Sequence, residues 1–273
     1  MSIEDIVLRH SGRGMDILRP HLPPDFIEQT ADKLLALERK NILLTTGFYV
    51  AGYAETDGPP GTLFLAKALQ ALGFSPLILT DSFCRGFFEE SGIPIRYLEK
   101  GFDAKAILAD YAPVCLISIE RCGENIQNDY ANMRDVSIAE HTVEIDKLFD
   151  EALRQGVYTI GIGDGGNEIG MGNVKDIITT DLSLTPCRTE VTDLLIASVS
   201  NWGAYGLTAA LSVKTGTNLF DDYKTVDDYI KYIVSKGSVD GVNKTHVPTV
   251  DGYEPAVEQE IVDRLNAYIK SHI

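Results

Sequence analysis

The stretch ILLTTGFYVAGYAETDGPPGTLFLAKALQALG, residues 42–73, predicts the repeating unit of the fold. It begins with the short apolar run 42–46, continues through a long loop that contains several glycines, and ends in the segment 59–73, whose apolar residues have helical spacing. A buried strand followed by such a helix is typical of a parallel sheet covered by helices. Gly73 follows the last helical residue, as a left-handed C-terminal cap requires.

The same alternation continues along the chain. Further strands are expected at 75–80, 114–120, 158–162, 176–180 and 192–198, and helices at 25–40, 139–156, 202–216, 226–236 and 255–270. We therefore predict an α/β fold with three layers, a doubly wound, mostly parallel sheet with helices on both faces. No linker rich in proline or serine divides the chain, so residues 1–273 are expected to form a single α/β domain with a helical extension from about residue 217.

Composition limits the partners and the compartment. Forty acidic residues against 24 basic ones give a net charge of −16, which repels nucleic acid and anionic membranes, so we expect a small-molecule substrate instead. The four cysteines lack zinc-ligand spacing and fit a reducing cytoplasm, and the N-terminus carries charge where a secretory signal is apolar. Because α/β enzymes of this size commonly self-associate, we also expect a homo-oligomer.

Polar side chains follow the predicted strands at the edge where doubly wound sheets bind ligands. The first loop carries Glu55, Thr56, Asp57 and Gly58 just before a helix that opens with two prolines. Asp57 or Gly58 is also placed to cap that helix, which is the simpler interpretation of either residue. A cap, however, needs neither Glu55 nor so long a loop, and loops of this length are often functional.

The loop after 114–120 concentrates charged and amide side chains, namely Glu120, Arg121, Asn125, Asn132 and Arg134. A solvated surface loop has a similar composition. Glu120 and Arg121, however, come directly at a strand end, where the sheet fixes their positions, and an arginine there can grip a carboxylate through two hydrogen bonds.

The stretch IGIGDGGNEIGMGNV, residues 160–174, matches GxGxxG after a strand but is not typical of a dinucleotide site. Asp164 and Glu168 would repel a pyrophosphate, so no nucleotide cofactor is expected. Its glycines, which include Gly165 and Gly166, instead indicate positive φ angles and close backbone approach around Asp164, Asn167 and Glu168. Asn201 follows the last strand and completes the polar set.

This set favours a hard divalent cation, Mg²⁺ or Mn²⁺, because its ligands are oxygens rather than sulfur or imidazole. Without a metal, neighbouring carboxylates would raise one another's pKa and so provide a general acid and a general base. We predict catalytic, substrate-binding and metal-ligating candidates as follows: catalytic Asp57, Asp164 and Glu168; substrate-binding Glu55, Thr56, Gly58, Arg121, Asn125, Asn132, Arg134, Gly165, Gly166, Asn167 and Asn201; metal-ligating Glu120, Asp164 and Glu168.

Several of these segments together resemble the glutamate cyclase C-terminal domain family. The resemblance covers nearly the whole chain through ETDGPPGT (55–62), IERCGEN and YANMRD (119–135), IGDGGNEIGMG (162–172), SNWGAYG (200–206) and two late VDG triplets. Asp135 departs from the family, which has glycine after the arginine. The resemblance implies a lyase that converts D-glutamate to 5-oxo-D-proline and water. Asp164 or Glu168 would then take the ammonium proton, and Arg121 or Arg134 would hold the α-carboxylate.

A second resemblance leaves another function open. GDGGNEIGM is similar to the GDGxND motif of haloacid dehalogenase-like phosphatases, and the segment 55–58 is similar to their DxDG motif. Glu55 stands where that family has its aspartate nucleophile, so the resemblance implies a metal-dependent phosphatase that uses activated water on a small phosphate ester. A metabolite-binding domain without catalysis is the third alternative.

Overall fold

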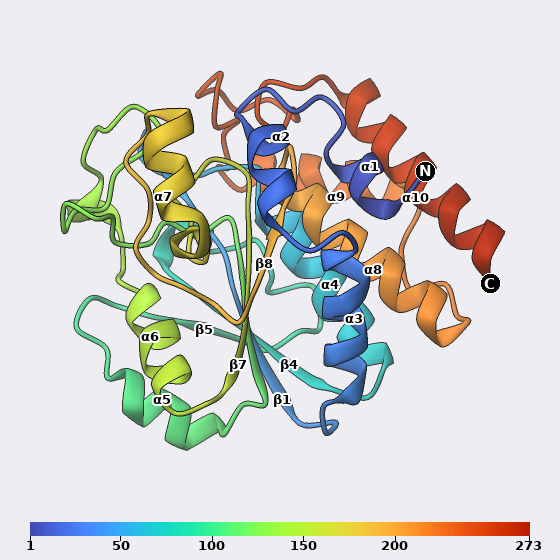
Figure 1. Cartoon of the computed structure of the whole chain (residues 1–273), viewed down its shortest axis with the longest axis horizontal. Helices are drawn as coiled ribbons and strands as arrows, with labels where there is room; N and C mark the ends of the chain where they lie inside the picture. The colour runs from blue at the N-terminus through green and yellow to red at the C-terminus, as the bar shows by residue number, and fades with distance from the viewer.

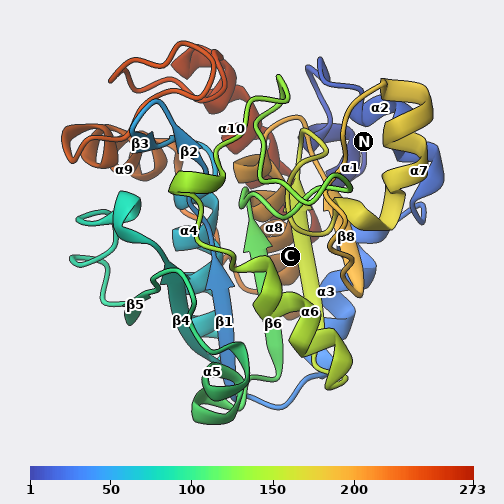
Figure 2. The same cartoon turned by 90° about the vertical axis from the view of Figure 1, so that its left-hand side faces the viewer.

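The computed structural model describes all residues, 1–273, and its centre is one six-stranded sheet (Figures 1 and 2). The strands lie in the order β5-β4-β1-β6-β7-β8, and every neighbouring pair is parallel. Their bounds are β1 Asn41–Thr45, β4 Ser75–Thr80, β5 Ile95–Tyr97, β6 Cys115–Ile119, β7 Tyr158–Gly163 and β8 Asp193–Ile196. The chain builds outward from β1 in one direction and then from β6 in the other, so the topological switch lies between β1 and β6.

Helices cover both faces of the sheet (Figure 1). One face carries α3 (Phe26–Ala36), α4 (Pro59–Ala71) and α8 (Ser200–Thr215); the other carries α5 (Ala104–Tyr111) and α6 (Asp146–Arg154). Beyond the first face, α1 (Ile3–Val7) and α10 (Pro255–His272) pack on α8, and α9 (Tyr223–Ser235) packs on α4 and α10. The predicted doubly wound α/β fold is confirmed, and its sheet is parallel throughout.

Short elements connect this framework. A two-stranded antiparallel hairpin, β2 and β3, lies beyond the ends of the main strands (Figure 2). The bounds of the short elements are β2 Tyr49–Val50, β3 Tyr53–Ala54, α2 Met15–Leu18, α7 Lys175–Ile177, the 3₁₀ turns η1 Arg19–His21, η2 Ser82–Cys84, η3 Ala139–His141 and η4 Met171–Val174, and the π turn η5 Ile178–Leu182.

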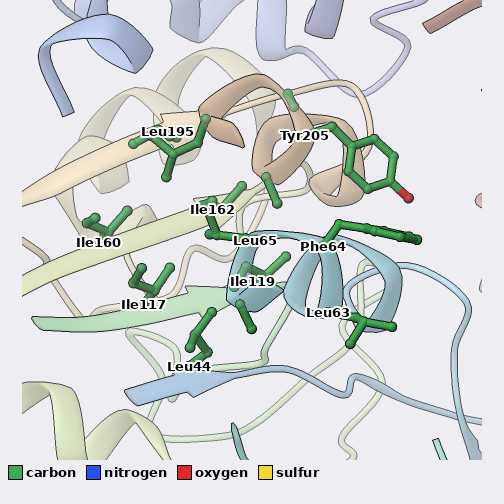
Figure 3. Packing of buried hydrophobic residues seen from close by; sticks show 14 of the residues in the cluster. Leu44, Leu63, Phe64, Leu65, Ile117, Ile119, Ile160, Ile162, Leu195 and Tyr205 are labelled. Carbon is green, nitrogen blue, oxygen red and sulfur yellow. The ribbon is translucent and has the colours of Figure 1, made fainter. Parts of the chain in front are cut away.

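The core lies between the sheet and α4 with α8 (Figure 3). Leu44, Ile117 and Ile160 are partners in register on β1, β6 and β7, so their side chains form one apolar row under the helices. All three are essentially inaccessible to solvent. Since helices cover both faces of these strands, the strand sequences are continuous apolar runs rather than alternating apolar and polar residues.

Helix α8 is buried along most of its length, from Ser200 to Ser212. Its glycines permit close packing: a β-carbon on Gly203 would lie 2.6 Å from the Ile162 side chain, and one on Gly206 would lie 2.8 Å from Val7. A helix with apolar or small side chains on all sides is typical of a protein interior. Helix α8 accordingly lies between the sheet and the outer helices α1 and α10. This position fixes its N-terminus at the switch point.

The predicted strand at 176–180 is wrong. The segment is helical, α7 followed by η5, and the Thr179 hydroxyl donates to the Lys175 carbonyl four residues earlier. Branched side chains favoured a strand, but β7 pairs directly with β8 and leaves no place between them. Strand β5 was not predicted, because it is short and only half-buried. The left-handed cap at Gly73 is confirmed by its φ of 87°, and Gly156, after α6, also has a left-handed backbone, with a φ of 74°.

None of the helices combines the length and the apolar composition needed to cross a membrane.

Candidate active site

A cavity of about 460 Å³ opens at the switch point, beyond the ends of β1 and β6. It has a floor of buried carboxylates, a wall of apolar side chains and a rim of two exposed cations. The floor consists of Glu55, Glu120, Glu168 and Asp251, with Arg13 beside them; the wall includes Phe48, Val50, Met133, Val136, Ile138 and Val242; the rim consists of Arg134 and Lys244. Five separate segments of the chain therefore meet around one cavity.

Glu120 begins the floor immediately after β6. Its φ of 47° is uncommon for a residue with a side chain, although eight other non-glycine residues of the chain also have a positive φ. The Glu120 amide donates to the Ile162 carbonyl at 3.1 Å, so β7 holds its backbone, and the Ser200 hydroxyl donates to its carboxylate at 2.6 Å. The N-terminal turn of α8 thus helps to fix this side chain.

The glycine-rich loop turns back over the end of β7. A β-carbon on Gly161 would lie 2.5 Å from the Ile169 carbonyl oxygen, so no larger residue fits there. Gly166 has a φ of 107°, and its amide donates to the Glu168 carboxylate at 2.7 Å. The prediction that these glycines provide positive φ and close backbone approach is confirmed. The element that follows the loop is the short 3₁₀ turn η4.

Two groups of three carboxylates meet in the floor and share Asp164. Asp57, Asp164 and Asp251 form one group, and Glu120, Asp164 and Glu168 form the other, with the ligand atoms of each group within 4.8 Å of one another. Arg13 neutralises the first group, because its guanidinium donates to Asp164 and to Asp251 at 2.8 Å each. The predicted carboxylates are therefore close together, although they come from different loops.

In the second group only Asp164 contacts a protein cation, and Glu120 and Glu168 make no ion pair. One oxygen of Asp164, Oδ2, is buried and has no hydrogen-bond partner, while the other accepts from Arg13. Three carboxylates at this spacing and an oxygen left without a donor fit a hard divalent cation, whose preferred ligands are carboxylate oxygens. Glu120, Asp164 and Glu168 are the residues that would hold it.

Burial and mutual repulsion shift the ionisation of the floor. Burial raises the pKa of Glu120 well above its usual value, and the charges of Glu168 and Asp164 raise it further. Burial also raises the pKa of Asp164, although Arg13 opposes this shift, and it raises the pKa of Glu168. Without a cation, these carboxyl groups therefore hold protons more tightly than exposed ones and are suited to proton transfer.

Asp57 and Asn201 connect the N-termini of the two central helices. Asp57 accepts from the amides of Ser200 and Asn201 at 2.9 and 2.7 Å, which caps α8. In return, the side-chain oxygen of Asn201 accepts from the amides of Gly58 and Gly61 at 2.9 and 2.8 Å, which caps α4. Asp57 does not line the cavity and is therefore a cap, as the simpler interpretation predicted, but on α8 rather than on the helix that follows it.

Arg121 does not line the cavity, so its placement does not support the expected contact with a substrate carboxylate. Its side chain is 1% exposed, pairs with Asp81 at 2.6 Å, and donates to the carbonyls of Gly47 and Val143. The guanidinium thus ties the loop after β1 to β4 and the loop before α6. Asn125 also lies outside the cavity, where its side-chain oxygen accepts from two backbone amides of its own loop.

The other predicted binding residues divide between the cavity and the layer behind it. Asn132, Arg134, Asn167 and Glu55 line the cavity. Thr56 and Gly58 lie behind the floor, where the Thr56 hydroxyl donates to the Thr249 carbonyl at 2.7 Å and Gly58 has a φ of 97°. Gly165 packs against Met133 and Glu168, and Gly166 holds Glu168 as described above.

Sequence reasoning missed the contributions of the two ends of the chain. Arg13 lies in the N-terminal segment, whose charge served only as evidence against a signal peptide. The C-terminal extension contributes four more residues: Gly241, Val242, Lys244 and Asp251. The repeated VDG triplet was the available signal, because it marks the turns that bring Gly241 and Asp251 to the floor. A β-carbon on Gly241 would lie 1.7 Å from the Glu55 carboxylate, so a larger residue there would displace that side chain.

The fold and this cavity define a doubly wound α/β protein with an acidic, cation-compatible site at its switch point. The family model described as D-glutamate cyclase-like, C-terminal, matches residues 3–266, and the chain belongs to this family. The resemblance inferred from the sequence motifs is thereby confirmed.

Two individual proteins are similar to the chain. The human mitochondrial D-glutamate cyclase is 33% identical in an alignment 204 residues long that covers 64% of this chain and 33% of the human protein. The chain thus matches about a third of the length of that relative. The crystal structure of an exopolyphosphatase-related protein from Bacteroides fragilis aligns with a TM-score of 0.42 and 10% identity, over 90% of this chain and 61% of that one.

Proposed function

We propose that the protein is a lyase that cyclises D-glutamate, or a closely related small amino acid, to 5-oxo-D-proline with loss of water. Membership of the D-glutamate cyclase-like family and the name of the human relative support the reaction class. The observation that carries the proposal is the carboxylate group at the floor: Glu120 and Glu168 line a cavity open to a small molecule, and Asp164 lies buried behind them, with the ligand atoms of all three within 4.8 Å of one another.

Arg13 and Glu55 are suited to hold the amino-acid head of the substrate. Both line the cavity, and the Arg13 side chain remains 27% exposed while it contacts Asp164 and Asp251. Its remaining N–H groups can donate hydrogen bonds to the α-carboxylate. The Glu55 carboxylate has no hydrogen-bond donor within the protein and is suited to the α-ammonium group. In this arrangement Arg13 takes the part that was expected of Arg121 or Arg134.

Ring closure requires an uncharged amine, so a carboxylate must remove one ammonium proton. Glu168 is suited to this step because it lines the cavity and burial raises its pKa, which makes its ionised form a stronger base than an exposed glutamate. That proton, and the second one that the nitrogen releases as the lactam forms, are then available to the oxygen that leaves as water. The amine and the γ-carboxyl group belong to the same bound molecule and are held beside one another. Much of the entropic cost of bringing two reacting groups together is thereby removed.

A divalent cation, Mg²⁺ or Mn²⁺, held by Glu120, Asp164 and Glu168 would supply Lewis-acid polarisation of the γ-carboxyl group. It would also offset the negative charge that a glutamate, with two carboxylates of its own, brings into an acidic site. Support for the cation is the buried, unpartnered oxygen of Asp164 together with the spacing of the three carboxylates.

The test is formation of 5-oxoproline from D-glutamate, followed by mass spectrometry with and without added Mg²⁺ or Mn²⁺, and with L-glutamate in parallel. Glu168→Gln and Asp164→Asn are expected to lose at least about a hundredfold in rate if they take part in proton transfer or cation binding. Glu140→Gln, an exposed change outside the floor, is the matched control. Absence of 5-oxoproline under every metal condition would refute the proposal.

A further inference from the structure

The cavity is larger than the reaction of free glutamate requires. A volume of about 460 Å³ is available. Pockets of roughly 300–1,000 Å³ hold drug-sized ligands, whereas glutamate has only about ten non-hydrogen atoms. The floor and Arg13 provide partners for the ammonium group, the α-carboxylate and the transferred proton. The wall and the rim therefore remain without an occupant when glutamate is bound at the floor.

The chemistry of that remaining space is not uniform. Its wall is apolar and partly open, with Met133, Val136 and Val242 between 36% and 57% exposed. Above it, Arg134 and Lys244 are exposed and make no ion pair, although other exposed cations of this acidic chain, such as Lys33, do. An apolar surface that ends at two unpaired cations is complementary to an apolar group that carries a carboxylate.

The charge of the floor favours a neutral γ-group. The carboxyl groups at or directly behind the floor, those of Glu55, Glu120, Asp164, Glu168 and Asp251, are opposed there by the single guanidinium of Arg13. A free γ-carboxylate adds a further negative charge at this point. A γ-amide adds none, and in a γ-glutamyl amino acid the second carboxylate lies several bonds away, toward the rim.

We propose that this cavity also cyclises γ-D-glutamyl amides of apolar amino acids, releasing the free amino acid together with 5-oxo-D-proline. The α-amine, after loss of a proton to a floor carboxylate, attacks the γ-carbonyl carbon and forms the lactam C–N bond. The new lactam nitrogen then loses its second proton, the amide C–N bond breaks, and the departing nitrogen takes up both protons and leaves as the ammonium group of the free amino acid. No water is consumed or released, and no oxidant or other reactant is needed.

This inference rests on the proposed cyclase chemistry but assigns a different leaving group. In the geometry proposed, the glutamyl head lies at the floor, the apolar side chain of the departing residue lies against Met133, Val136 and Val242, and its carboxylate lies at Arg134 and Lys244. Lys244 is then a specificity-determining residue for the departing amino acid. It comes from the C-terminal loop that also supplies Asp251.

A matched pair of substrates tests this geometry. γ-D-Glutamyl-leucine carries the second carboxylate, and γ-D-glutamyl isopentylamide is the same molecule without it. The purified full chain is incubated with each compound and with D-glutamate in parallel, and 5-oxoproline and the released amine are quantified by mass spectrometry. We expect a preference in kcat/KM of about fivefold for the leucine conjugate, which is the size of effect that one exposed ion pair supports.

Substitution at the rim completes the test. In Lys244→Ala the preference for leucine over isopentylamide should fall to about onefold to twofold, whereas Lys270→Ala, at an exposed position on α10, should retain it. Cyclisation of D-glutamate without release of leucine from the conjugate overturns this inference and leaves the proposed function intact. Release of leucine without cyclisation of D-glutamate refutes dehydration as the activity and supports the conjugate reaction. If the unmodified protein and Lys244→Ala each use the two conjugates equally well, the proposed recognition of the second carboxylate at the rim is wrong.

Discussion

Replacement of Arg13 by glutamine gives the most direct test of how the acidic floor is stabilised. The guanidinium contacts Asp164 and Asp251 at 2.8 Å, and these carboxylates are 0% and 4% exposed. Burial alone would lower the pKa of Arg13, but the two carboxylates outweigh it and raise that pKa, so the arginine is charged at any ordinary pH. Arg13→Gln keeps most of the side-chain volume and removes only the positive charge.

The expected loss can be worked from the burial of the partners. Removing one member of a fully buried ion pair costs about 3–5 kcal/mol. The Arg13 side chain is 27% exposed, so solvent offsets part of this cost. We expect a loss of about 2 kcal/mol in the free energy of unfolding, or roughly 4–8 °C in Tm for a chain of this size, near pH 8.

The loss should depend on pH with a definite sign. The pKa values of Asp164 and Glu120 are raised in the folded protein, so the folded state binds more protons than the unfolded state between the unfolded and folded pKa values. Stability therefore falls as pH rises through that window, and it falls more steeply when Arg13 is absent. Near pH 5.5 the carboxyl groups can take up protons, and the loss should shrink to about half.

The assay is thermal unfolding at both pH values in the presence of a chelator, so that no added cation replaces the arginine. Arg134→Gln is the matched control: it removes an arginine at the rim that makes no ion pair, and it should change stability by no more than about 0.5 kcal/mol. A loss in Arg13→Gln that is equal at the two pH values, or no larger than that of the control, would show that the guanidinium does not neutralise the floor.

Three further predictions concern the surroundings of the floor. Asn201→Ala leaves the amide of Gly61 without its side-chain acceptor and the amide of Gly58 with Asp57 alone, and it should cost about 1–3 kcal/mol in urea unfolding; a loss below about 0.5 kcal/mol would contradict the cap. Gly241→Ala should displace Glu55 and lower kcat/KM for 5-oxoproline formation at least about tenfold. Gly12→Ala is the control and should leave kcat/KM unchanged, because its β-carbon meets nothing closer than 3.8 Å. Equal activity of the two variants would disprove the steric argument. Burial raises the pKa of Glu258 to about 7 from a usual 4.5. The free energy of unfolding should therefore decline as pH rises between these values, by at most about 3 kcal/mol. Glu258→Gln should flatten this decline in a pH series of unfolding curves.

Much of the fold could be predicted because strand and helix signals were local. The apolar run 42–46 and the helical spacing of 59–73 correspond to β1 and α4 within a residue or two, and the glycine caps mark the helix ends. The error at 176–180 has a tertiary cause, since branched residues there lie in a helical turn beside an already completed sheet edge. The strand propensity of a segment does not indicate whether the folded sheet has a free strand for it to pair with.

The site could be predicted only in part. Asp164, Glu120 and Glu168 follow strands, so the sheet itself brings them together. The direction of a side chain was not predictable in the same way: Arg121 follows Glu120 directly, yet it points into the layer beneath the cavity and pairs with Asp81. Arg13 and Asp251 carry no strand signal, and their place depends on long-range packing of the terminal segments.

The ion pair between Arg13 and Asp251 joins residues from opposite ends of the chain. During synthesis on a ribosome, the sheet and its first helices can form while the later residues are still enclosed, but the charge balance of the floor cannot. The pocket is therefore among the last parts of the molecule to be assembled, and a nascent chain halted before residue 251 would hold its carboxylates together without their full set of partners.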